Sequence, residues 1–446
     1  MCQDTPALTR RWLGSTAAAL LLGAVMFTVG AIGLAPEGNT SARRAGGTSE
    51  HPAPDRGVDA LRARVDRLPR DAGAWAALGI AHLEQARVTA DPAAHDRAES
   101  ALRRSLTVQP DGNTAAETGL GALAAARHDF PTALTWARKA TTGDPYNPAA
   151  HGVLADARTQ LGQYEAADRA VQRMNDLNPD SSALARASYA LELRGDTTRA
   201  RSLMRRALTA AATPGERSFA RGTLSALALQ EGDAPQALEQ ARAGLRTDPG
   251  DPALLEAEAR AHTALGRTRQ AIRAYEAALA VAPLPHYLLG LGELQQSLGR
   301  QDRAEEQYAL LRAQETMRRS GGEPGSGPAD TDAILFEADH GRPDQAVAMA
   351  AEALRTRPFI AVHDAQAWAL HRAGREDEAL DHADRALALG TRSALFHYHR
   401  AVIHHALGNT AAARRDLTTA LGTEPRFHPL HAPVARALLR RIDHTP

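Results

Sequence analysis

The chain has 446 residues, enough for several domains, and its composition is rich in apolar residues (43%) but poor in aromatic ones (4%). Its 52 basic and 52 acidic residues cancel, so charge gives no reason to expect nucleic acid as a partner. The one cysteine, Cys2, excludes an intramolecular disulfide and a cysteine-rich zinc site. Lys139 is the only lysine, a bias typical of a GC-rich, actinobacterium-like bacterial genome.

Residues 12–35 predict a membrane-spanning helix. This segment holds 24 residues without a charge, and about 20 apolar residues are enough to span a bilayer. Arg10 and Arg11 directly precede it, so the positive-inside rule predicts that the tail of residues 1–11 is cytoplasmic and that the rest is extracytoplasmic. We therefore expect a single-pass protein of the cytoplasmic membrane. The alternative is secretion after cleavage near Ala35, which the following proline disfavours.

A linker and a capping helix are predicted next. Residues 36–57 combine several prolines and glycines with no hydrophobic period, which predicts a flexible linker. In residues 58–70 the apolar side chains, from Val58 to Leu68, recur at helical spacing. We expect this amphipathic helix to cap the N-terminal end of the folded body.

A repeated pattern occupies residues 71–425. Eight glycines each stand five residues before an alanine, and successive glycines are 33 to 42 residues apart. After the alanine, small or apolar residues recur at helical spacing and a proline commonly ends the run, as in Ala271, Ala278 and Pro283. Each unit is therefore predicted to be a helix, a turn at the glycine and a second helix. The glycines are Gly162, Gly195, Gly232, Gly266, Gly299, Gly341, Gly374 and Gly408.

This pattern resembles the tetratricopeptide repeat family, whose unit of about 34 residues places a large residue, leucine and glycine before alanines and a closing proline. Trp75, Leu78 and Gly79 begin the first match, and His128 replaces the turn glycine of the second. The resemblance implies an all-α fold, an α-solenoid superhelix of about ten helix-turn-helix repeats. It also implies a scaffold that brings proteins together.

Two segments depart from the repeat. Residues of about 313–330, which include Gly321 and Pro324, predict a loop inserted into the array. Residues 426–446 predict a second capping helix, in which apolar residues such as Leu438 alternate with arginines. Both ends of the array are thus expected to be covered.

The motifs of common enzyme classes are missing from the sequence. No glycine-rich phosphate loop ends in lysine, and there is neither an H-E-x-x-H zinc motif nor a G-x-S-x-G turn. We therefore expect no catalytic activity and no cofactor. The predicted function is non-enzymatic binding of a protein or peptide in the concave groove of the solenoid.

Polar and aromatic residues of the first helices are the candidates for that groove. Equivalent positions carry Asp156 and Gln160 in one repeat and Arg260 or Glu293 in others, which makes no shared cationic pocket for a peptide carboxylate. The aromatic candidates fit the repeat core equally well. The candidate groove residues are Asp156, Gln160, Tyr189, Arg260, Glu293, Trp368, His371, Tyr398 and His405.

Histidine is concentrated towards the C-terminus, where nine of the eighteen fall between residues 363 and 431. The candidate metal ligands among them are His371, His397, His404 and His405. These histidines indicate an alternative function, in which the chain is an extracytoplasmic protein that binds or handles metal ions. The competing interpretation assigns His397 to the repeat core, and a third makes the groove sensitive to pH.

Overall fold

The computed structural model describes residues 54–89, 93–320 and 329–444. Within these ranges the chain forms 22 helices and no strand, so the prediction of an all-α fold is confirmed. None of the described helices is long and apolar enough to cross a bilayer. The predicted membrane helix of residues 12–35 and the predicted tail of residues 1–11 lie outside the described residues, as does most of the predicted linker.

Twenty of these helices form ten consecutive hairpins, which confirms the predicted number of repeats. The first helices of the hairpins are α3 (Ala72–Thr89), α5 (Thr114–Ala126), α7 (Pro148–Gln160), α9 (Ser181–Glu192), α11 (Pro214–Gln230), α13 (Pro252–Ala264), α15 (Pro285–Ser297), α17 (Thr331–His340), α19 (Ile360–Arg372) and α21 (Ala394–Ala406). The second helices are α4 (Ala93–Val108), α6 (Phe130–Gly143), α8 (Tyr164–Leu177), α10 (Thr197–Ala210), α12 (Ala234–Leu245), α14 (Thr268–Val281), α16 (Gln301–Ser320), α18 (Pro343–Thr356), α20 (Glu376–Leu387) and α22 (Thr410–Thr423).

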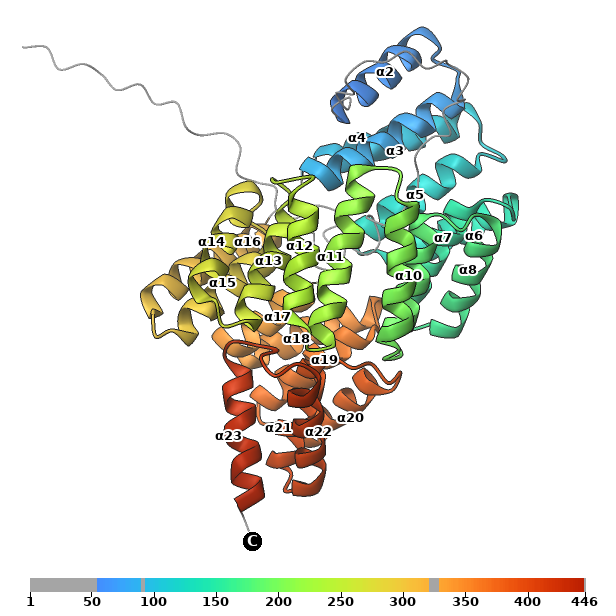
Figure 1. Ribbon diagram of the computed structural model, residues 1–446. Coiled ribbons are helices and arrows are strands. Elements are labelled where there is room, and N and C mark those ends of the chain that lie inside the picture. Colours follow the sequence, from blue (N-terminus) through green and yellow to red (C-terminus); the bar gives the residue numbers. More distant parts are fainter. Residues whose placement is uncertain (1–53, 90–92, 321–328, 445–446) are drawn as a thin grey trace, which may run out of the picture.

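The hairpins stack into a curved array with two layers (Figure 1). Successive first helices pack against one another, as in α3, α5 and α7 or α17, α19 and α21, whereas successive second helices share no comparable contact. Because the layer with the closer spacing lies on the inside of a curved stack, the first helices form the inner, concave layer.

The recurring alanines explain how closely the two layers approach. All eight of them, one near the start of each second helix from α8 to α22, are at most 3% exposed. Gly244 illustrates the same need for small residues, because a Cβ built on it would lie 2.5 Å from a methyl group of Leu254. Larger side chains at these positions would push neighbouring helices apart.

The turn between the two helices uses a left-handed backbone, as the glycine pattern predicts. Seven of the eight recurring glycines have φ between 68° and 77°, and His128 takes the same conformation with φ of 58°. The exception is Gly341, whose φ is −129°. A Cβ on Gly341 would lie 2.6 Å from the carboxyl group of Glu337, so a larger residue there would require the Glu337 side chain to move.

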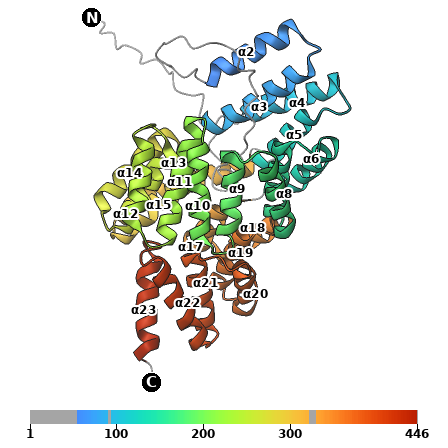
Figure 2. The same ribbon diagram turned by 45° about the vertical axis from the view of Figure 1, so that its right-hand side comes forward.

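The array curls far enough for distant repeats to touch. The backbone N–H of Ile360 donates a hydrogen bond to the Tyr164 hydroxyl at 3.1 Å, although the two residues are 196 positions apart. Further along the same seam, the carbonyl oxygen of Gly390 lies against Gly195. One superhelical turn therefore takes about six repeats of about 34 residues. Both views show the orange helices of the second turn beneath the green helices of the first (Figure 1 and Figure 2).

Three predicted boundaries need correction. The N-terminal helix α2 (Pro54–Arg67) ends before Leu68, which is 53% exposed, because the residue before a proline disfavours helical geometry. The predicted loop at 313–330 begins later, since α16 continues to Ser320 through a run of good helix formers. The C-terminal helix α23 (His431–His444) occupies only part of the range 426–446, and buries residues such as Leu438.

Candidate partner-binding site

Arg260 is an accessible charged side chain on the inner helix α13. Its side chain is 47% exposed and forms an ion pair with Glu256, one helical turn earlier, with 3.7 Å between Nε and Oε1. Glu256, then Glu424 and Asp332, interact electrostatically with Arg260 and raise its pKa. The three carboxylates come from α13, from the N-terminus of α17 and from the end of α22. We name these four residues the Arg260 site.

Carboxylates outnumber cations at the Arg260 site. Burial, followed by the nearby carboxylates of Asp330, Glu293 and Glu256, raises the pKa of Asp332 to about 7. The side chain of Asp332 has neither a hydrogen bond nor an ion pair with another described residue. The carboxylates of the Arg260 site repel one another at short range. A further cation that entered the site would reduce this repulsion, so the site should attract it.

Asp156 and Gln160, two predicted groove residues on α7, are buried instead. Asp156 is 6% exposed and accepts two hydrogen bonds from Arg186 on α9, at 2.9 Å from Nε and 2.7 Å from Nη2. Gln160 is 3% exposed. Because a buried ion pair with this geometry already uses its hydrogen-bonding capacity, Asp156 joins repeats and offers little to a partner.

Tyr189 lies beside a small cavity between α7, α8 and α9. The cavity is lined by Asp156, Tyr164, Tyr189 and Arg194 among others, and its volume is about 10 Å³. A single water needs about 10–15 Å³ of this kind of volume. The half-buried Tyr189 therefore does not open onto a pocket large enough for a peptide side chain.

Glu293, another predicted groove residue, is 7% exposed on α15. Its carboxylate lies 2.9 Å from Nε2 of His428 and 3.7 Å from Nε2 of His340. Burial alone would raise the pKa of Glu293, but His428, His340 and His431 lower it to about 2. The side chain is thus an ionised partner for residues of the eighth hairpin and of the chain that follows the tenth.

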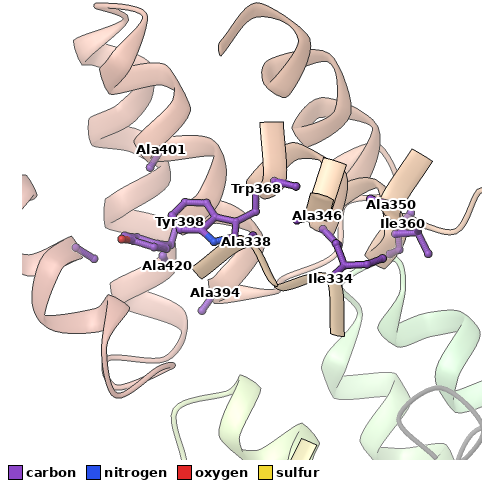
Figure 3. Packing of buried hydrophobic residues seen from close by; sticks show 14 of the residues in the cluster. Ile334, Ala338, Ala346, Ala350, Ile360, Trp368, Ala394, Tyr398, Ala401 and Ala420 are labelled. Carbon is purple, nitrogen blue, oxygen red and sulfur yellow. The ribbon is translucent and has the colours of Figure 1, made fainter. Parts of the chain in front are cut away.

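Trp368 and Tyr398 belong to the core, which corrects their assignment to the groove. Each is 3% exposed, and they pack with Ile334, Ala338 and several alanines (Figure 3). The indole Nε1 of Trp368 donates a hydrogen bond to Asp339 at 3.0 Å. Neither ring presents a face to a partner.

The four candidate metal ligands are engaged elsewhere or lie apart. His371 donates from Nδ1 to Glu376 at 2.8 Å, and His397 from Nδ1 to Asp416 at 2.9 Å. His404 and the exposed His405 remain on α21. In the parts of the chain that the structure describes, no group of three or more histidine, cysteine or acidic side chains could hold a metal ion.

Among the nine candidate groove residues, Arg260 is exposed and interacts with carboxylates from three different repeats. Glu256 could have been found from the sequence, because it stands four residues before Arg260 on the same helix. Asp332 and Glu424 could not, since they come from repeats far along the chain and reach Arg260 only through the superhelical turn.

Family models support the repeat assignment in two places. One described as tetratricopeptide repeat matches residues 124–191, and another with the same description matches residues 256–317. These two segments carry the sequence pattern of tetratricopeptide repeats. Comparison with curated proteins gave no match.

Several solved tetratricopeptide-like structures resemble the array. A Pseudomonas aeruginosa pilF structure is 21% identical, with 48% of this chain and 94% of that one covered and a TM-score of 0.38. A tetratricopeptide repeat protein from Parabacteroides merdae is 18% identical, covering 59% and 99%, with a TM-score of 0.34. A human IFIT1 dimer with PPP-AAAA is 15% identical, covering 82% and 86%, with a TM-score of 0.45.

Proposed function

We propose that this chain is a non-enzymatic scaffold that binds a basic segment of a protein partner at the Arg260 site. Tetratricopeptide arrays generally offer an extended concave surface for binding other proteins. The observation that carries the proposal is the set of three carboxylates that interact with one solvent-accessible guanidinium and come from three different repeats. This arrangement leaves negative charge that a lysine or arginine of the partner would neutralise.

Arg260 and its neighbours divide the task of recognition. Asp332, which lacks an ionic partner among the described residues, is the acceptor for a cationic side chain. Arg260 can donate to backbone carbonyl groups of the same segment while it stays paired with Glu256. Since the pKa of Asp332 is about 7, binding of a cation at neutral pH should release part of a proton from it.

Fluorescence anisotropy with labelled peptides tests this function. Three extended peptides of equal length, rich in lysine, in glutamate or in serine, are titrated with the purified chain. We expect binding of the lysine-rich peptide alone, and a loss of about tenfold or more, about 1.4 kcal/mol, in the double variant Glu256→Gln and Asp332→Asn. The double variant should fold, because it removes like charges that repel each other.

Glu239→Gln on the outer helix α12 is the matched control, since Glu239 is an exposed carboxylate outside the inner layer. Equal binding of the three peptides would contradict the proposal, as would an equal loss of affinity in the control. Calorimetry in two buffers with different heats of ionisation adds a second readout. The wild type should show buffer-dependent heat near pH 7, and Asp332→Asn should not.

We also propose that residues 12–35 hold the chain in the cytoplasmic membrane with the repeat array outside. The support is the uncharged run behind Arg10 and Arg11. Cys2, the one cysteine, provides the test. A membrane-impermeant maleimide should label Cys2 only after the cells are lysed. Labelling in intact cells would overturn this orientation, and a mature mass that lacks the first 35 residues would show cleavage instead.

A further inference from the structure

The C-terminal residues connect the end of the array to its middle. We name residues 426–444, which include helix α23, the C-terminal segment. The guanidinium of Arg426 lies against Gly266, where a Cβ would be only 2.2 Å from its Nη1 atom. Two positions later, Nε2 of His428 lies 2.9 Å from the Glu293 carboxylate. The segment thus contacts the sixth and seventh hairpins, although it follows the tenth.

A second contact reinforces the first. Nε2 of His431, at the start of α23, lies 3.4 Å from the carboxylate of Asp339 on α17. Its ring stacks on that of His428, with centroids 4.2 Å apart, and on Tyr398, with centroids 5.0 Å apart. The two histidines therefore form one unit, held by a carboxylate from each of two inner helices.

The C-terminal segment is directly linked to the Arg260 site. Glu424, one of the three carboxylates of that site, stands two residues before Arg426 and four before His428. A movement that separates His428 from Glu293 would also withdraw His428 from Glu424, with which it interacts electrostatically. The contact between His428 and Glu293 and the charge of the Arg260 site are therefore electrostatically coupled.

We propose that the C-terminal segment is a pH-sensitive clasp that closes the superhelix beside the Arg260 site and opens when His428 loses its proton. The consequence for partner binding rests on the function proposed above, whereas the opening itself does not. An open clasp would withdraw the positive charge of His428 from Glu424 and so leave the Arg260 site more negatively charged. Partner binding would then depend on the charge of one histidine.

The charged groups around His428 set the direction of the pH response. Burial opposes its protonation, but the carboxylates of Glu293, Asp339 and Glu424 outweigh burial and raise its pKa. The other facing groups are His340 on α17, which shares Glu293, His431 on α23, and Arg260 on α13, which interacts with Glu424. A raised pKa means that the ion pair stabilises the closed state below the ordinary value and is lost as the pH rises through the raised one.

Protonation of His431 is expected to destabilise the closed clasp at low pH. Burial, together with the neighbouring His428, lowers the pKa of His431 to about 4 despite the contact with Asp339. At neutral pH His431 is therefore uncharged and can stack on His428 without bringing a second positive charge. Acidification would add a second positive charge to this stack, so the clasp is expected to be tightest near neutral pH and to loosen on either side.

Hydrogen–deuterium exchange on the full chain, without any peptide, tests the clasp. Exchange in α23 is compared between pH 6.5 and 9 with exchange in α6, which lies in the second hairpin and corrects for the intrinsic effect of pH. We expect the protection of α23 relative to α6 to fall by about tenfold or more as the pH rises, because the charge-assisted hydrogen bond to Glu293 is lost.

The variants His428→Gln and Glu293→Gln should both remove this pH dependence, because neither can form the ion pair. His405→Gln, at an exposed histidine on α21, should behave as the wild type. Constant relative protection in the wild type, or a pH response that persists in both variants, would overturn the clasp. Since no peptide is present, a failure of peptide binding would refute the proposed function and leave this result standing.

Discussion

Gly195→Ala tests whether the two superhelical turns press against each other. Gly195 has φ of 73°, and a Cβ on it would lie 2.3 Å from the carbonyl oxygen of Gly390, well short of the 3.4 Å of an ordinary contact. Gly374 provides a matched control, because its φ is 75° and no heavy atom lies within 4 Å of its Cβ. Both substitutions thus introduce the same backbone strain, but only Gly195→Ala also creates a close contact with the carbonyl oxygen of Gly390.

The expected losses of stability follow from these geometries. A left-handed backbone costs an alanine about 1–2 kcal/mol, which both variants bear. In Gly195→Ala alone the turns must also separate by about 1 Å, and a gap of that size forfeits about a quarter to a half of the dispersion energy along the seam. With an overpacking term of about 1–3 kcal/mol, we expect a total of about 2–5 kcal/mol for Gly195→Ala.

Urea unfolding followed by circular dichroism measures this difference, and small-angle X-ray scattering provides a second readout. Gly195→Ala should unfold at a lower urea concentration than Gly374→Ala and should have a larger radius of gyration than the wild type. If both variants lose the same stability and scatter like the wild type, the two turns do not touch at this seam.

Three further predictions concern stability. Trp368→Ala should lower the free energy of unfolding, measured in urea, by about 3–5 kcal/mol. The control Tyr146→Ala, at a residue that is 73% exposed, should change it by at most about 0.5 kcal/mol. Similar losses in the two variants would refute the core position of Trp368. Tyr164→Phe should cost about 1 kcal/mol and speed deuterium exchange at the Ile360 amide, and an unchanged exchange rate would refute that hydrogen bond. Asp416 is held at a pKa of about 2 by its histidine and arginine partners, despite burial, so it contributes about 2 kcal/mol that is lost as the pH falls from 4 to 2. Asp416→Asn should lack this loss in urea titrations at the two pH values.

The architecture was predictable because its causes are local. A glycine five residues before an alanine specifies a left-handed turn and then a helix with a small residue at its tightest contact. The structure repeats this arrangement through the array, with Gly341 as the exception. Where local signals compete, prediction failed. Residues 313–320 precede a glycine-rich run, yet their own helix propensity extends α16 to Ser320.

The candidate site was predictable only in part, because its remaining members depend on superhelical pitch. Arg260 and Glu256 lie on one helix, and their spacing alone brings them together. Asp332 and Glu424 approach them because small rotations between neighbouring repeats add up over several repeats. The total rotation cannot be predicted from the sequence of any single repeat. For the same reason the sequence pattern places Glu293 in the groove, although His428, which follows the tenth hairpin, covers it.

Contacts between superhelical turns also change how the array should fold. In an open solenoid each repeat contacts only its neighbours, so stability is a sum of local terms and unfolding can begin at either end. Here the hydrogen bond between Ile360 and Tyr164 joins residues 196 positions apart. The ion pair between His428 and Glu293 likewise joins the C-terminal segment to the seventh hairpin. Opening an end therefore breaks contacts in the middle, which makes unfolding more cooperative. Because such long loops must close before these contacts form, the same closure should slow folding.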